Sequence, residues 1–299
     1  MVLVFSQLQE SVTNLYPQTR TRMILGHLRR FDVEEVGVMV RTRDLRKAAI
    51  KDKVKAYSDA GHLLINQGHN YHLFTRPDLR RYQVDLLRGH GQLSAYASYR
   101  GHTYLRELEY SANQDSRGEL EHFSRSRGLV PVFVDLRVQD NALNYLYQQA
   151  VSRRRQLDMG QLQDAWVELL WPQLVEAWYE QLALGGGPLV LVLEEHDLTA
   201  YFLPGLMERM QAVGGRFVAP SVYFSSAPQL KSPASLTHAS FTQTSLTRPE
   251  PGQSKSGQAS AYLARLLQMQ PPRRQPLVLG GEREWVRVVT EQFPTLLEF

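Results

Sequence analysis

Two histidines, His69 and His72, follow a short apolar run within residues 60–79 of the sequence. The run, residues 63–65, predicts a buried β-strand, and the polar residues behind it predict a turn. In α/β barrels the active site lies where such strands end, on the loops that follow them. Neutral imidazole is a frequent ligand of zinc and related metals. His69 and His72 are therefore candidate metal ligands; the alternative is that they are polar residues lining a cleft without metal.

Acidic side chains follow two other apolar runs. Residues 189–193 lead into a polar group made of Glu194, Glu195, His196 and Asp197. Residues 130–134 lead into Asp135, which we expect at the same face of a barrel. Two neighbouring carboxylates can share a raised pKa, or one can face solvent and the other the cleft. These groups are candidate general bases, and they could also complete a metal site with the two histidines.

The elements that would position these residues alternate along the chain. Further strands are predicted at residues 2–5, 36–40, 93–99 and 216–219, and helical patterns lie between the strands, including a long one over residues 141–184. Strand and helix alternating about seven times favour a parallel α/β sheet, either closed or doubly wound. No Gly-x-Gly-x-x-Gly follows the first strand and no Walker-type loop occurs, which argues against nucleotide binding.

The composition divides the chain into three parts. Residues 1–224 carry the alternating elements, and residues 225–258 are rich in Ser, Thr, Pro, Gln and Gly, as in a polar linker or long loop. Residues 259–299 predict a small C-terminal helix, strand and helix. We therefore expect one barrel domain with an appended extension.

Charge and composition exclude several classes of protein. The 299-residue chain has a formal net charge of +4 and no cysteine, which excludes thiolate chemistry. Its arginine clusters are not interleaved with aromatic residues, so no nucleic-acid surface is expected. No apolar run is long enough to span a bilayer. The first residues, MVLVFS, do not read as a signal peptide, so a cytoplasmic location is expected unless an export signal was removed.

Several segments resemble those of the polysaccharide deacetylase superfamily (carbohydrate esterase family 4, NodB homology). They are Ser-Asp-Ala-Gly-His at residues 58–62, the segment 130–147, Asp-Leu-Thr-Ala at 197–200 and Gly-Arg-Phe-Val at 215–218. The likeness covers roughly residues 2–224. It implies a distorted (β/α)7 barrel of the polysaccharide deacetylase type.

The resemblance also implies a chemistry. Members of this family bind a divalent metal, commonly zinc, through one Asp and two His. They remove acetyl groups from polysaccharides with a metal-activated water, an Asp base and a His acid. Polysaccharide or oligosaccharide is therefore the implied ligand of this chain.

The positions that carry this chemistry are changed in the sequence. Ser6 and Gln7 stand where the family has an Asp-Asp pair, and Gln67 and Tyr71 stand at the two metal histidines. Glu194 aligns with the closing histidine. The expected substrate cleft is lined by residues from these strand ends: Gln7, Gln67, Tyr71, Tyr99, His196 and Asp197.

Three hypotheses follow. The chain is a catalytically impaired homologue without a metal cofactor that binds glycan or supports a partner enzyme of polysaccharide modification. Alternatively, it is an active zinc-dependent deacetylase with rewired ligands His69, His72 and Glu194, in which Glu194, Glu195 or Asp135 is the base. In the third, it is a scaffold or regulatory module whose working parts lie after residue 224.

Overall fold

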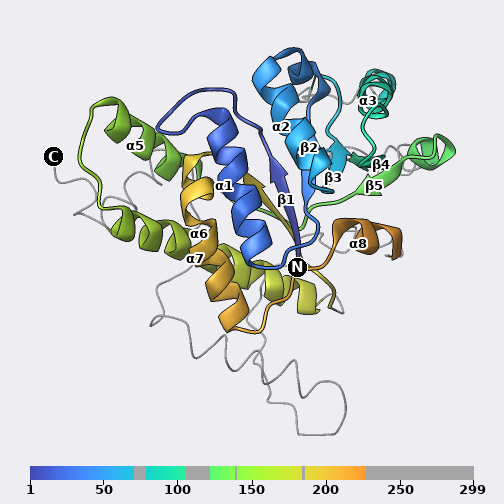
Figure 1. Cartoon of the computed structure of the whole chain (residues 1–299). Coiled ribbons are helices and arrows are strands. Elements are labelled where there is room, and N and C mark those ends of the chain that lie inside the picture. Colours follow the sequence, from blue (N-terminus) through green and yellow to red (C-terminus); the bar gives the residue numbers. More distant parts are fainter. Residues whose placement is uncertain (71–78, 106–121, 139, 184–185, 227–299) are drawn as a thin grey trace, which may run out of the picture.

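The computed structural model describes residues 1–70, 79–105, 122–138, 140–183 and 186–226 (Figure 1). Tyr71 and His72 lie outside the described residues. The predicted linker and C-terminal extension also lie outside them from residue 227 onward.

Seven parallel strands form one sheet in the described part of the chain, in the order β5-β4-β3-β2-β1-β7-β6. The strands are β1 (Val2–Ser6), β2 (Gly37–Val40), β3 (Leu63–Asn66), β4 (Tyr99–Tyr104), β5 (Val130–Val132), β6 (Leu136–Arg137) and β7 (Val190–Glu194). Strands β5 and β6 follow each other in the chain but stand at opposite edges of the sheet. The curled sheet is therefore a barrel that stays open between them, and the predicted seven-stranded α/β fold is confirmed.

Helices alternate with these strands. They are α1 (Pro17–Arg30), the short 3-10 helix η1 (Thr42–Arg46), α2 (Ala48–Asp59), α3 (Leu79–Leu93), α5 (Asn141–Ser152), α6 (Met159–Ala183), α7 (Asp197–Ala212) and α8 (Pro220–Ser226). Within the described ranges, no helix is both long and apolar enough to cross a membrane.

Alternating side chains of each strand enter two different core layers. Leu3 and Phe5 of β1 belong to the larger layer, beneath α1, α2, α6 and α7. Val2 and Val4 face the barrel interior, where they join the smaller layer with Phe224 of α8. Figure 1 shows α1, α6 and α7 together on one side of β1, with α8 apart from them. Burial on both faces explains why the strands are apolar runs without alternation.

Two predicted strands are wrong. Residues 93–99 were expected to form one, but Leu93 ends α3 and lies on its buried face one heptad after Leu86, and β4 begins only at Tyr99. Residues 216–219 form no strand, although Val218 N donates a hydrogen bond to Met1 O. The strand that the sequence analysis did not predict is β6 (Leu136–Arg137), whose two residues are too few to show a periodic pattern.

The long helical region predicted over residues 141–184 is two helices, α5 and α6. The chain turns between them at Arg154, which has a left-handed φ of 53°. A second irregularity lies in α7, where Pro204 has no N–H for the carbonyl of Ala200. His27 Nε2 of α1 lies 2.9 Å from that carbonyl oxygen and replaces the missing donor. This contact ties α1 to α7.

The interior of the barrel contains a histidine that should make folding depend on pH. His102 of β4 is 3 % exposed, neither ring nitrogen has a hydrogen-bond partner among the described residues, and the Phe224 ring lies 5.9 Å away. Burial lowers the pKa of His102 to about 4, from 6.5 in an unfolded chain. The unfolded state therefore binds more protons between these values, and stability falls as the pH drops from 6.5 to 4, by up to about 3 kcal/mol.

We expect His102→Phe to remove this part of the pH dependence. Denaturant unfolding at pH 7 and pH 4 measures it, with His122→Phe, which replaces an exposed histidine, as the matched control. If His102→Phe loses as much stability between the two pH values as the wild type does, the account of His102 is wrong.

Candidate functional site

The carboxyl ends of β1 and β7 lie side by side and bring Gln7 and Glu194 into contact. Ser6 ends β1 opposite Glu194, the last residue of β7. Gln7 follows with a left-handed φ of 50°, which turns the chain away from the sheet. Its Nε2 donates a hydrogen bond of 2.6 Å to Glu194 Oε1. The sequence analysis predicted Gln7 and Glu194 to belong to the same site at the strand ends, and the structure shows them in contact.

Arg137, at the end of β6, completes this corner of the barrel. Its Nη1 donates to Ser6 Oγ at 2.9 Å, and its Nη2 lies 3.9 Å from Met39 Sδ. Burial raises the pKa of Glu194, while the charges of His196 and Arg137 act in the opposite direction. The sequence analysis missed Arg137, because a two-residue strand gives no pattern that would place it at the barrel mouth.

The loop after β3 is built around two buried polar side chains. Asn66 Nδ2 donates to Leu86 O and its Oδ1 accepts from Gly68 N, both at 2.9 Å. Asp85 of α3 accepts from the backbone N–H groups of His69 and Asn70, also at 2.9 Å. His69 is 5 % exposed, and its Nδ1 lies 3.1 Å from Thr42 Oγ1. His69 is therefore held inside the loop.

Gly68 is the position where this loop tolerates no side chain. Its φ is +85°, and a Cβ there would lie 2.4 Å from Asp85 Oδ2. We expect Gly68→Ala to destabilise the chain more than Gly61→Ala, because the clash with Asp85 adds to the backbone strain of about 1–3 kcal/mol that both variants carry. Gly61→Ala is the control, because Gly61 has the same φ with nothing within 4 Å of its Cβ position. Thermal unfolding of both variants measures the difference. Equal losses of stability would mean that the contact with Asp85 does not contribute to the destabilisation.

A cleft of about 350 Å³ opens between the chain after β1, the ends of β2 and β3, and η1. Its lining combines apolar side chains, Leu8, Met39, Val40 and Ile50, with polar and charged ones, Gln7, Gln9, Glu10, Ser11, Arg41, Asp44, Lys47 and Gln67. The sequence expectation that Gln7 and Gln67 line one cleft agrees with this geometry. Amide, hydroxyl and cationic groups donate hydrogen bonds, and the amides also accept them.

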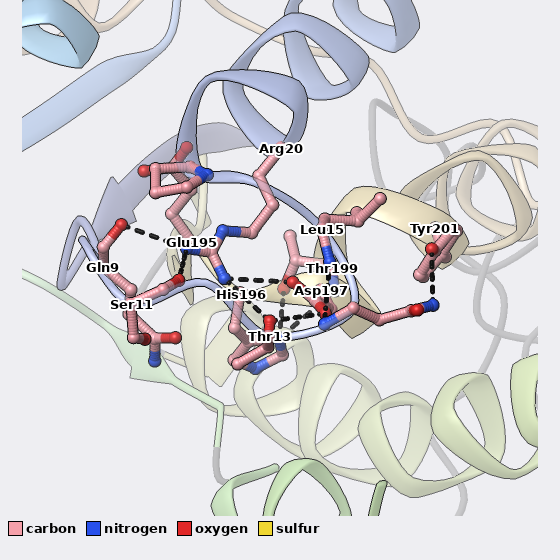
Figure 2. A network of polar contacts seen from close by, with 12 residues as sticks. Gln9, Ser11, Thr13, Leu15, Arg20, Glu195, His196, Asp197, Thr199 and Tyr201 are labelled. Carbon is pink, nitrogen blue, oxygen red and sulfur yellow. Dashed lines mark hydrogen bonds and ion pairs between the residues drawn. The ribbon is translucent and has the colours of Figure 1, made fainter. Parts of the chain in front are cut away.

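Behind the cleft, Asp197 anchors the chain that follows β1. One carboxylate oxygen, Oδ2, accepts from Thr13 Oγ1 at 2.6 Å and from the N–H groups of Asn14 and Leu15. The other, Oδ1, lies 3.0 Å from Arg20 Nη1. Figure 2 shows the Arg20 guanidinium between Ser11, Thr13 and Asp197, and it also donates to the carbonyls of Gln9 and Ser11.

Two further buried pairs flank Asp197. Glu195 Oε2 lies 3.0 Å from Lys53 Nζ, both with fully buried side chains, and burial raises the pKa of Glu195 and lowers that of Lys53. His196 Nε2 lies 2.9 Å from Asp140 Oδ2. Burial lowers the pKa of His196, but the charge and hydrogen bond of Asp140, together with the charges of Glu194 and Asp197, outweigh this effect, so the pKa is raised.

Several predicted site residues therefore lie elsewhere. Glu195, His196 and Asp197 are buried in the polar network behind the cleft and are at most 2 % exposed. Tyr99 is buried, and its hydroxyl lies 3.0 Å from His90 Nδ1 of α3. Asp135 precedes β6 and accepts a hydrogen bond from Val190 N at the start of β7. The prediction that Asp135 joins Glu194 at one barrel face is wrong, because Asp135 lies at the amino ends of the strands.

The described residues do not form a site suited to binding a metal ion. Among the residues that the structure describes, no three His, Asp or Glu side chains lie close enough together to bind one. The groups at the ends of β1 and β3 are a hydroxyl and three amides, from Ser6, Gln7, Asn66 and Gln67, which are poor ligands for zinc. His72, the expected second ligand, lies outside the described residues.

No protein-family model and no curated protein matches the sequence. Two similar solved structures are the wild-type form of a CE4 family pseudoenzyme from Bacillus anthracis and a mutant of it with restored enzymatic activity. The wild-type form has 8 % sequence identity and a TM-score of 0.50, and the match covers 75 % of this chain and 64 % of that chain. The mutant has 9 % identity, the same TM-score, and coverage of 75 % and 66 %.

This likeness, together with the parallel sheet, confirms the expected fold. The chain is a distorted (β/α)7 barrel of the polysaccharide deacetylase (CE4) type. The match spans about two thirds of the length of these two structures.

Proposed function

We propose that the chain acts in glycan metabolism by binding an oligosaccharide in the cleft at the ends of β1, β2 and β3, without removing acetyl groups. One observation supports this most. Gln7 and Gln67, two uncharged amides at the ends of β1 and β3, line a cleft where the resemblance calls for an Asp and a His that bind the metal. Ser6, just before Gln7, stands at the position of the carboxylate base. Amides donate and accept hydrogen bonds with sugar hydroxyls, but they neither abstract a proton nor hold zinc well.

A second candidate function, deacetylation with rewired residues, is favoured by Glu194. This carboxyl group is 5 % exposed, contacts Gln7 of the cleft, and has a raised pKa because it is buried. A carboxyl group with a raised pKa at a strand end fits a general base. Metal ligation in this candidate would need His72 beside His69 and Glu194.

Acetate release separates the two candidates. The full chain is incubated with an acetylated chito-oligosaccharide and added zinc, beside Glu194→Gln, which keeps an acceptor for Gln7 but carries no charge. The proposal predicts no acetate above the blank for either protein. Zinc-dependent release that Glu194→Gln abolishes would contradict it and establish the second candidate. Support of a partner enzyme and a cytoplasmic location stay predictions.

A further inference from the structure

A second pocket, of about 220 Å³, lies at the opposite end of the barrel from the cleft. It is formed where the amino ends of β1 and β7 meet the last turn of α6 and the turn that follows α7. Its lining residues are Met1, Trp178, Gln181, Leu182, Gly187, Gly214, Gly215 and Arg216. None of these residues lines the cleft, so the pocket is a separate site.

Backbone hydrogen bonds order the walls of this pocket. Gly186 N donates to Gln181 O at 2.8 Å and closes the end of α6. Gly215 N donates to Met210 O at 2.9 Å and closes the end of α7. Since protein donors already occupy these carbonyls, the helix ends do not offer them to a ligand.

Two polar side chains of the lining lack a partner among the described residues. Gln181 is 8 % exposed, and within the described part of the chain its amide has no hydrogen-bond partner. Buried amides are ordinarily hydrogen-bonded, so this one is suited to a ligand. The Arg216 side chain is exposed, and its guanidinium pairs with no carboxylate of the described residues. As far as the described residues form it, the lining has one charged side chain, that of Arg216.

The other side chains of the lining are apolar and include a tryptophan of fixed orientation. The Trp178 ring stands edge to face on Trp171, with ring centroids 5.9 Å apart and an interplanar angle of 79°. Trp171 is held in turn by Arg209, whose guanidinium carbon lies 4.5 Å from the Trp171 ring centroid. Leu182 also lines the pocket and is 39 % exposed. An apolar lining with one cation and one amide suits a ligand that has an apolar body and a single polar head.

We propose that this pocket binds a small carboxylic acid with an apolar body, an aryl or branched-chain carboxylate. Arg216 binds the carboxylate through charge-assisted hydrogen bonds, the Gln181 amide donates a further one, and the apolar body lies against Trp178. The volume of about 220 Å³ is below the about 300–1,000 Å³ of pockets for drug-sized ligands, which limits the ligand to about one ring. The site is independent of the function proposed for the cleft.

A sugar is a less suitable ligand for this pocket. A sugar ring presents hydroxyl groups around its whole edge, and each hydroxyl that is buried without a partner costs free energy. The described lining has two polar side chains against three apolar ones, Met1, Trp178 and Leu182. A carboxylate places its acceptors at one end of the molecule, where a guanidinium and an amide are sufficient to bind them.

Saturation-transfer NMR titrations of the full chain test the inference with three kinds of probe. Benzoate and isovalerate are the acids, benzamide and isovaleramide are their uncharged counterparts, and a methyl glucoside represents a sugar. The test variants are Arg216→Gln, which removes the charge, and Gln181→Leu, which removes the amide at similar size. The matched control is Arg22→Gln, which replaces an exposed arginine of α1.

We expect wild type and Arg22→Gln to bind at least one of the acids at least about tenfold more tightly than its amide, the effect of one charge-assisted hydrogen bond. Arg216→Gln should abolish this difference by weakening the acid, and it should change the affinity for the amide by less than about twofold. Gln181→Leu should weaken the binding of both acid and amide, with thermal unfolding measured to show that the variant is folded.

Four outcomes would overturn the inference. The first is that wild type binds neither acid, and the second is that it binds each acid no more tightly than its amide. The third is an acid affinity that Arg216→Gln leaves unchanged. The fourth is binding of the glucoside, lost in Gln181→Leu, without binding of either acid, which would make the pocket a sugar site.

Discussion

Lys53→Met should lower the free energy of unfolding by about 3–5 kcal/mol, because it leaves a buried carboxylate without its cation. Lys53 and Glu195 are both fully buried, and their charged groups lie 3.0 Å apart. After the replacement, the hydrogen bond from Thr21 Oγ1, at 2.6 Å, is the one that the Glu195 side chain keeps among the described residues. Denaturant unfolding at neutral pH measures the loss.

Two further variants make this prediction specific to the buried charge. The double variant Lys53→Met with Glu195→Gln should recover most of the stability, since neither charge then remains and Gln can still accept from Thr21. Arg30→Ala, which breaks the exposed pair with Glu208, should cost at most about 1 kcal/mol. A double variant as unstable as Lys53→Met would show that packing, and not the unpaired charge, is responsible.

Arg20→Met should reduce stability by a similar amount, about 3–5 kcal/mol, and should also weaken glycan binding. The Arg20 guanidinium holds Asp197 and the backbone oxygens of Gln9 and Ser11, two residues that line the cleft. Losing it leaves Asp197 without its cation and frees the chain after β1 from its anchor. We expect affinity for the bound oligosaccharide to fall at least about tenfold, or about 1.4 kcal/mol.

The Lys53→Met variant is the matched control for this second effect. This variant removes a buried cation of the same network, but within the described part of the chain the hydrogen bond of Lys53 is to Glu195 and not to a cleft residue. Binding measured at a temperature where both variants remain folded should therefore be weakened in Arg20→Met and nearly unchanged in Lys53→Met. Equal affinities in the two variants would contradict the role of Arg20 in holding the cleft.

The sequence allowed the fold and half of the site to be predicted. The apolar runs that became β2, β3 and β7 are buried on both faces, so their positions follow from composition alone. Gln7 and Gln67 follow such runs directly, and parallel strands bring their carboxyl ends to the same edge of the sheet. Asp135 was misplaced because it precedes β6, a strand too short to be recognised, and so it lies at the other edge.

The burial of Glu195, His196 and Asp197 could not be predicted, because the residues that pair with them lie far away in the sequence. Glu195, His196 and Asp197 read as cleft residues, yet their partners come from α1, α2 and the start of α5. A local signal did exist: Lys53 lies on the buried face of α2 with Ile50, Val54 and Tyr57, where an apolar residue is expected. A lysine at such a position indicates a buried acidic partner, but the pattern does not say which one.

Calorimetric titration in the presence of a chelator tests most directly whether the cleft binds glycan without metal. An oligogalacturonide and a neutral acetylated oligosaccharide are titrated into wild type, into Gln7→Ala with Gln67→Ala, and into Gln211→Ala, which replaces an exposed glutamine of α7. The account predicts that wild type and Gln211→Ala bind at least one of the two with EDTA present, and that the double variant does not. No binding in EDTA, binding restored only by zinc, or full binding by the double variant would contradict it.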